Sequence, residues 1–498
     1  MTIGLSNFVP LSSDSTKSRQ NATNLLSLRD QMTDLQRQLA TGKLSSTYAG
    51  LGTGALKSLD LRETLARYDD FASTITDATT RLKLMDATLT GIAGEQQTIK
   101  KGLVASGMST LQSNGQSLAQ QTAQNSMKSV IGMLNTDAAG RYLFSGRATD
   151  TEPVLDYATI INGTPTEAGL AQIIGERKAA DNPDGKGRVT VDSATTAGTV
   201  TVGNAASPLG ITVGAPSSQT AAITVSTAGT PPSASFVVAS QPADGAVVQL
   251  GISFPDGTTK VLTLTARTGT ADPTKGEFQV GADTTATANA LGATITGLMQ
   301  TEAATDLASA SAMKAATDFF SATPASPYVR LSAATPAGTV QWYRGDTTST
   351  DPRSTAIAQV DKNQTVAVGA QANEPAFVKF MAQLGVLSVE TFSASNPNDS
   401  ARYDAMAQRA APDTGTGAST TQRVSDVQVS LGVALATLNT AKSRNTANAA
   451  TLKDALSGIE DADSTKVAVE LSDLQTRLQA SYSTTSMLSK MSLVNYLG

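Results

Sequence analysis

The residue types that most often carry enzyme chemistry are missing from this sequence. Among its 498 residues there is no histidine and no cysteine. Without histidine the chain lacks the commonest general base, the imidazole metal ligand and any Ser-His-Asp triad. Without cysteine it lacks disulfides, thiolate zinc ligands and thiol nucleophiles. Carboxylate chemistry, such as that of a glycosidase or a lyase, is the main alternative left open.

The carboxylates of the middle region do not favour that chemistry. Asp244, Asp256 and Asp346 could suggest a carboxylate pair or a calcium site. They lack the spacing of an EF-hand, and isolated aspartates more commonly cap turns. A two-acid active site is further disfavoured because this region is poor in glutamate. We therefore predict a chain that is not an enzyme and that has no catalytic residue, no cofactor and no metal.

A short glycine-containing segment, residues 140–146, could be taken for a phosphate-binding loop. It reads GRYLFSG, with a single arginine and no Lys-Ser/Thr pair after it. A phosphate-binding loop needs that lysine and hydroxyl. We interpret the segment instead as the turn that leads from a helical rod into a separate domain.

Both ends of the chain carry apolar residues at helical spacing, and the long middle does not. A stripe of this kind covers one side of a helix and is buried against another helix. The pattern predicts a chain that leaves a helical rod, builds a domain and returns to the same rod. The stripes include Leu25, Leu28, Met32, Leu35 and Leu39; Leu61, Leu65, Leu82, Met85 and Leu89; Val424, Val427, Leu431 and Leu438; and Leu471, Leu474 and Leu478.

The local signals predict rod helices over residues 15–41, 56–108, 117–139, 421–457 and 464–497. Gly42 supplies a closing residue for the first helix, and four glycines in the second half of the next one predict bends or breaks there. Alternating Val, Ile and Thr residues from 189 onward predict strands. Helices are expected over residues 284–300, 303–320 and 374–387, with a helical turn within 400–411.

These elements predict an α+β multidomain fold, with a coiled-coil rod and an inserted β-rich outer domain. We divide it into an N-terminal inner helix and loop (1–55), N-terminal rod helices (56–140) and a variable outer domain (141–370). The outer domain contains a small α+β module (234–325). A returning segment (371–420) and the C-terminal rod and inner helices (421–498) complete the chain.

Charge and hydropathy limit the surroundings in which the chain works. The formal net charge is -5, which gives no global attraction to nucleic acid or anionic lipid. No apolar run approaches the length of a membrane span. The first 14 residues lack the basic and apolar regions of a cleaved secretory signal. We therefore expect no nucleic-acid binding and no membrane insertion, and either a cytoplasmic protein or export without a cleaved signal.

Three segments resemble the bacterial flagellin family, which includes the filament subunit and the hook-filament junction protein, hook-associated protein type 3. They read QLATGK at residues 38–43, GRYLFSG at 140–146 and SKMSLVNYL at 489–497. The resemblance covers roughly the first 150 and the last 125 residues. WYRGD at 342–346 is also similar to a motif found where some members of the family return to the rod. The resemblance implies a structural subunit of the extracellular flagellum, secreted by the flagellar type III route without a cleaved signal peptide.

The chain differs from a typical filament flagellin at two places. Its opening reads TIGLSN at residues 2–7, and the turn after its first helix reads YAGLG at 48–52. Filament flagellins carry Ile-Asn-Thr-Asn-like and Asp-Asp-Ala-Ala-Gly-like strings there. The ending LVNYL also looks closer to the junction protein. The sequence thus slightly favours the junction protein, with the major filament flagellin as the alternative. A surface adhesin and a phage-tail or type III translocator protein are the alternatives of another class.

The resemblance also implies how the subunit assembles. The expected partners are other copies of the chain, hook-associated proteins, flagellin and an export chaperone. The terminal helices are expected to become ordered when neighbouring subunits bury their apolar stripes. The predicted assembly interface comprises Leu28, Leu35, Leu39, Leu82, Leu89, Leu431, Leu438, Leu471, Leu474, Leu478, Met491, Leu493 and Leu497.

Overall fold

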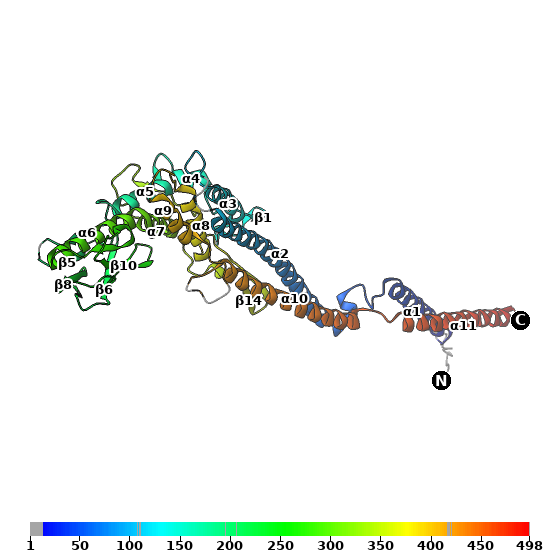
Figure 1. The fold of residues 1–498 in the computed structure, drawn as a ribbon. Coiled ribbons are helices and arrows are strands. Elements are labelled where there is room, and N and C mark those ends of the chain that lie inside the picture. Colours follow the sequence, from blue (N-terminus) through cyan, green and yellow to red (C-terminus); the bar gives the residue numbers. More distant parts are fainter. Residues whose placement is uncertain are drawn as a thin grey trace, which may run out of the picture. The chain divides into compact units, whose positions relative to one another are not determined.

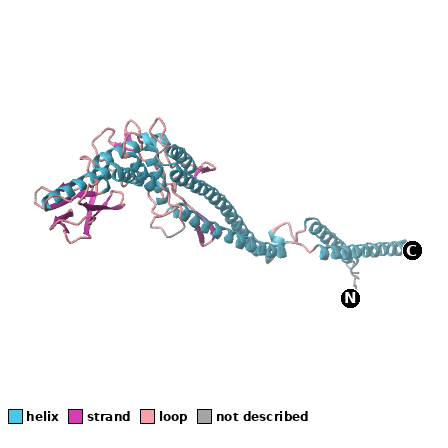
Figure 2. Ribbon diagram, viewed as in Figure 1, coloured by secondary structure: helices cyan, strands magenta, loops and turns pink. Residues whose placement is uncertain are grey.

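The computed structural model describes residues 13–106, 108, 111–194, 196–205, 207–415, 419 and 421–497. The chain forms two compact units. Unit 1 contains the described residues up to 76 together with 359–364 and 439–497, and unit 2 contains the described residues of 77–358 and 365–438. The predicted fold class is confirmed, because long N- and C-terminal helices contact each other and a β-rich region is inserted between them (Figure 2).

Unit 1 pairs the two terminal helices, α1 (Ser13–Thr41) and α11 (Ser464–Leu497), which pack along each other (Figure 1). Helix α1 ends where predicted, because Gly42 adopts a φ of 65° and its amide donates to Gln38 O at 2.8 Å. A 3-10 turn, η1 (Tyr48–Leu51), follows in the loop. Unit 1 also holds the first part of α2 (Gly54–Ser106) and the second part of α10 (Val424–Glu460).

Helices α2 and α10 continue into unit 2. A break predicted at Gly91, Gly94 or Gly102 does not occur, because α2 runs without interruption through all three, whereas Gly107 lies outside the described residues. Each glycine costs about 1 kcal/mol, whereas each fully buried large apolar side chain on this helix, such as Met85 or Ile92, contributes about 1.5–3 kcal/mol. With 53 residues, α2 is about 80 Å long.

Helix α3 (Leu118–Leu134) starts at a capping box made by Ser117 and Gln120. It ends at Leu134 rather than near residue 139 as predicted. The side chain of Asn135 accounts for the early end, because it accepts from Val154 N at 2.9 Å and donates to Val154 O at 2.8 Å. These two hydrogen bonds fix the backbone after the helix. A short hairpin, β1 (Asp137–Ala138) and β2 (Arg141–Tyr142), follows.

The segments on either side of the inserted module form a group of helices, which we call the helical body. Helices α4 and α5 were not predicted, because their 6 and 12 residues carry little periodic signal. Trp342 anchors the core of the body, because its Nε1 donates to the backbone oxygen of Phe320 at 2.8 Å and its ring packs edge to face on the Phe320 ring at 5.2 Å between centroids. The body contains α4 (Tyr157–Asn162), β3 (Glu167–Ala168), α5 (Leu170–Asp181), α7 (Ala308–Ser321), β12 (Gly338–Thr339), α8 (Pro375–Val389) and α9 (Asp399–Ala410).

The inserted module consists of two four-stranded sheets, one α-helix and a short 3-10 turn. Its sheets have the orders β4-β5-β8-β7 and β11-β10-β9-β6, with only β11 parallel to its neighbour. One core, from Val189 to Ala310, is shared by both sheets and α6. The elements are β4 (Val189–Asp192), β5 (Thr199–Asn204), β6 (Thr212–Ser218), β7 (Ile223–Ala228), β8 (Ser233–Val238), β9 (Val247–Ser253), β10 (Thr259–Arg267), η2 (Pro273–Lys275), β11 (Glu277–Gln279) and α6 (Thr284–Glu302).

The module joins the body through a single turn of π-helix, η3 (Ala303–Leu307), which connects α6 to α7 without a break. Its other connection passes Gly187, whose Cα lies so near Leu307 that an added Cβ would be 2.8 Å from Leu307 Cδ2. The two connections are therefore adjacent in space. The domain boundaries given above from the sequence stay a prediction.

An ionic cluster also fixes the module to the body. Arg409 on α9 donates to Asp256 Oδ2 at 2.8 Å and to Asp306 Oδ1 at 2.9 Å. Lys260 on β10 donates to Asp306 Oδ2 at 2.9 Å and to Glu302 Oε1 at 2.7 Å. Burial raises the pKa of Glu302, while Lys260 and Arg409 lower the pKa of Asp306 against the effect of its own burial.

Candidate assembly interface

The predicted stripe residues of α2 and α10 are buried within the single chain. Leu82 and Leu89 are 1% and 0% exposed, and Leu431 and Leu438 are 2% and 0% exposed. Polar contacts beside the stripes join the two helices, with Gln428 Nε2 donating to Thr90 Oγ1 at 3.2 Å. In this conformation these four leucines stabilise the subunit itself. Their part in contacts between subunits stays a prediction.

The stripes of α1 and α11 are less completely covered. Leu474 and Leu478 are buried, whereas Leu28, Leu35 and Leu471 are only partly covered and Leu39 is 43% exposed. The side chains of Met491, Leu493 and Leu497 lie outside the described residues, although the α11 backbone is helical through Leu497.

Apolar side chains are also exposed on this helix pair. Leu26 on α1 is 60% exposed, and Val469, Tyr482 and Met487 on α11 are 65%, 57% and 64% exposed. A pair of helices with so much exposed apolar surface leaves area for a further helix to cover.

The chain segments that leave α1 and α10 are bound to each other inside unit 1. Leu44 N donates to Glu460 O at 2.8 Å, and Ala462 N donates to Gly42 O at 2.9 Å. Lys43 Nζ donates to Asp461 Oδ1 at 2.5 Å. The loop after the first helix and the turn before the last helix therefore form one joined structure, which we call the clasp (residues 42–44 and 460–462).

Glu460 is the central charged group of the clasp. Its side chain is 5% exposed, and it accepts from Arg62 Nε at 2.7 Å, Arg62 Nη2 at 2.6 Å and Ser58 Oγ at 2.5 Å. The Arg62 guanidinium, helped by Ser58 and Lys43, lowers the pKa of Glu460 to about 2. Glu460 is therefore ionised throughout the physiological range and joins the start of α2 to the end of α10.

A second polar group interrupts the apolar stripe of α10. Asn445 is 2% exposed, and its Nδ2 donates at 2.8 Å to the backbone oxygen of Val360. Val360 belongs to β13 (Ile357–Asp361), which pairs with β14 (Gln364–Ala367). Beside it, Arg444 Nη2 donates to Asp361 Oδ2 at 3.0 Å. A buried asparagine in a helical stripe fixes one register, because its hydrogen bond exists only there.

At the other end of the rod helices, two sequence motifs meet where the chain leaves for the body and returns from it. Asp346 N donates to Ser145 O at 2.9 Å, which joins the GRYLFSG and WYRGD segments. Gly140 N donates to Asp137 Oδ2 at 2.9 Å, and Gly146 N donates to Ala370 O at 3.1 Å. Both glycine amides are thus used within the chain. The interpretation of residues 140–146 as a turn, rather than a phosphate-binding loop, fits this geometry.

The three candidate aspartates lie in three separate turns. Asp244 accepts from Thr268 N at 2.8 Å, and Asp256 and Asp346 accept from the amides of Thr258 and Thr348 at 3.0 Å and 2.8 Å. They therefore form no shared cleft. Within the described part of the chain, no group of three acidic side chains is placed to hold a metal ion, and none of the helices combines the length and apolarity needed to cross a membrane.

Sequence reasoning missed the clasp. Glu460 and Arg62 are 398 positions apart, and each is an ordinary charged residue beside an apolar stripe. The only local signal was the helix stop between α10 and α11. That signal could place Glu460 at a helix end, but it could not identify Arg62 as the partner of Glu460.

These features define a class of protein: a chain whose two helical ends pair with each other and whose middle forms a separate domain. The sequence model of the bacterial flagellin N-terminal helical region matches residues 13–149, and that of the bacterial flagellin C-terminal helical region matches residues 417–497. No curated protein is significantly similar to the chain in sequence.

The chain belongs to the bacterial flagellin family. It is accordingly a structural subunit of the extracellular flagellum and polymerises with flagellar axial proteins. This assignment replaces the phage-tail and translocator alternatives.

Proposed function

We propose that this chain is the hook-filament junction subunit of the flagellum. The observation that carries the proposal is the turn after the first helix. Residues 48–52 form the 3-10 turn η1 closed by Gly52, with Tyr48 48% exposed. Filament flagellins have an acidic turn at this place. An exposed aromatic ring in place of carboxylates changes what a neighbouring subunit must present there.

Assembly proceeds by completion of the terminal helix pair. In the single chain, α1 and α11 leave Leu26, Val469 and Tyr482 exposed by more than half. Burying one such side chain contributes about 1.5–3 kcal/mol, so a few contacts per subunit offset the loss of freedom on association. The same exposed surface requires protection before assembly. We infer that an export chaperone covers the α11 segment during type III secretion.

The junction and filament roles differ in what each face of the subunit binds. A filament subunit adds copies of itself without limit, whereas a junction subunit meets a different protein on at least one face. A strain that lacks this chain should keep its hooks and release flagellin into the medium. Purified chain mixed with filament fragments should remain monomeric or add only short assemblies, as seen by electron microscopy.

The main alternative is the major filament flagellin. Its support is that both family matches are to flagellin helical regions. Long filaments that grow from the seeds, or a filament isolated from cells and found to consist of this chain, would establish that alternative. The structural class of the protein would be unchanged.

A further inference from the structure

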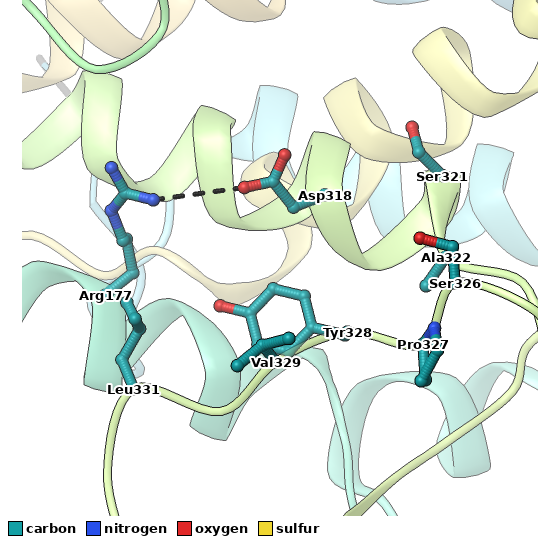
Figure 3. Close-up of a pocket in the computed structure, with 9 residues that line it drawn as sticks. All are labelled: Arg177, Asp318, Ser321, Ala322, Ser326, Pro327, Tyr328, Val329 and Leu331. Carbon is teal, nitrogen blue, oxygen red and sulfur yellow. Dashed lines mark ion pairs between the residues drawn. The ribbon is translucent and has the colours of Figure 1, made fainter. Parts of the chain in front are cut away.

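A pocket of about 320 Å³ lies beside α5 and α7 in the helical body (Figure 3). Its polar wall comes from Arg177 of α5 and from Asp318 and Ser321 of α7. Its other wall is the loop after α7, which contributes the ring of Tyr328 and the apolar side chains of Val329 and neighbouring residues. This volume is at the lower end of the range for small-molecule sites, so it suits one ring rather than a chain of rings.

Arg177 is a buried side chain with hydrogen-bonding capacity left over. It is 9% exposed, and its Nε donates to Asp181 Oδ2 at 2.6 Å. Its Nη1 lies 3.9 Å from Asp318 Oδ2, which is too far for a hydrogen bond. Figure 3 shows the Asp318 carboxylate directed toward this guanidinium across the pocket. The Nη atoms of Arg177 make no hydrogen bond of their own to any described residue and are not sealed away from solvent, so they can donate to a molecule bound in the pocket.

The charges around the pocket favour an uncharged ligand. A bound anion would be repelled by Asp318, and a bound cation would be repelled by Arg177 and by Lys314, whose Nζ donates to Asp318 Oδ1 at 2.5 Å. A neutral molecule with adjacent hydroxyl groups avoids both penalties. One hydroxyl can donate to Asp318 while the next accepts from Arg177.

The Tyr328 side chain suits the same kind of ligand. Burial raises the pKa of Tyr328 to about 12, so its hydroxyl stays protonated and can donate as well as accept. The face of its ring provides an apolar surface against which the C–H groups of a sugar can pack.

The wall that carries Tyr328 is held in place before any ligand arrives. Arg330 Nε donates to Glu176 Oε2 at 2.8 Å, and Arg330 Nη1 donates to Gly338 O at 3.1 Å. The side chains of Arg330 and Glu176 are 8% and 9% exposed. A wall fixed in this way lowers the ordering cost of binding.

We propose that the pocket formed by Arg177, Asp318 and Tyr328 binds a neutral pyranose ring, such as the terminal sugar of a surface glycan. One ring with a few hydrogen bonds binds weakly, with a Kd on the order of 1 mM. This activity is separate from assembly, because the pocket lies in the helical body and uses none of the predicted assembly residues.

Saturation-transfer NMR on the full-length, unassembled chain tests the proposal. The probes are the methyl glycosides of glucose, galactose and mannose at millimolar concentration, with sodium acetate as a charged comparison. At least one glycoside should receive saturation at its ring protons, and acetate should not. Absence of transfer to all three glycosides, or a stronger effect for acetate, would overturn the proposal.

Variants locate the site. Tyr328→Ala should reduce the transfer at least tenfold, and Asp318→Asn, at a side chain that is 34% exposed, should reduce it about fivefold without affecting folding. Val261→Ala, at an exposed position on β10, is the control and should leave the transfer unchanged. Transfer that survives both pocket variants would place binding elsewhere and refute the assignment.

Discussion

Replacing Glu460 with glutamine removes the charge at the centre of the clasp while keeping the shape of the side chain. The pKa of Glu460 is about 2 rather than its ordinary 4.5, a difference that corresponds to about 3 kcal/mol. Arg62, its main partner, is 49% exposed, so solvent screening reduces this contribution to about 1–2 kcal/mol. We expect Glu460→Gln to lower the free energy of local opening of the clasp by this amount at pH 7.

Hydrogen exchange followed by mass spectrometry measures that opening directly. The amides of Leu44 and Ala462 are hydrogen-bonded across the clasp. Peptides that contain them should exchange about 5–30 times faster in the variant than in the wild type. Glu63→Gln is a matched control, because Glu63 is 72% exposed and lies 3.8 Å from Arg67. It should leave exchange in the clasp unchanged.

The pH dependence supplies a second check. Because the folded-state pKa of Glu460 is depressed, its contribution to stability is fully present above the unfolded value of 4.5 and is lost as the pH falls toward 2. The difference between wild type and Glu460→Gln at equal pH should therefore shrink between pH 4.5 and pH 2. Equal exchange at pH 7, or a difference that persists at pH 2, would refute the role given to Glu460.

Further predictions concern assembly and the inserted module. Removing residues 481–498 should abolish entry into flagellar structures, as measured by sedimentation and microscopy. The near-ultraviolet circular dichroism of the middle region should stay intact. Normal assembly would show that this segment is not the interface. Leu82→Asp should destabilise the rod by several kcal/mol in urea unfolding, whereas Leu84→Asp, at a position 39% exposed, should cost under about 1 kcal/mol. Deleting residues 188–306 should leave the helical body folded, because the flanking residues are adjacent. A deletion that extends through residue 324 should unfold the body, since α7 carries part of its core. Similar thermal melts for the two deletion variants would count against a module boundary at residue 306. Arg409→Ala leaves the buried carboxylate of Asp256 without its cationic partner and should increase proteolysis between module and body about a hundredfold or more. An unchanged cleavage rate would show that the ionic cluster does not hold the module.

The helical ends could be predicted from the sequence because their signals are local and repeated. The stripe on α10 continues at spacings of three and four from Val424 to Leu438, and every one of those positions is buried. The end of α1 and the start of α11 also agree with the prediction, because Gly42 follows the first of these helices and Asp463 precedes the other.

No break occurs at Gly91, Gly94 or Gly102, because packing outweighs helix propensity at these positions. The stripe that includes Ile92 and Ile99 stays buried through the glycine-containing part, and this tertiary contact outweighs the glycine cost. The end of α3 was missed for a related reason, since Asn135 is held by residues nearly 20 positions away.

The clasp and the pocket could not be found from the sequence. Both join residues that are far apart along the chain, such as Lys43 and Asp461 or Arg177 and Tyr328. Lys43 ends the QLATGK segment, but that segment names no partner for it, and the other three residues belong to no motif discussed above. Only the fold brings them together, and so their chemistry appears only in three dimensions.

The central claim is that this chain is a structural subunit of the flagellar axial assembly. Immunoelectron microscopy of intact flagella from the source bacterium, with an antibody raised against the inserted module, tests it most directly. We predict label on the axial structure, confined to a narrow band where the hook meets the filament. Intact flagella that carry no label at any point along the hook or the filament would contradict the account.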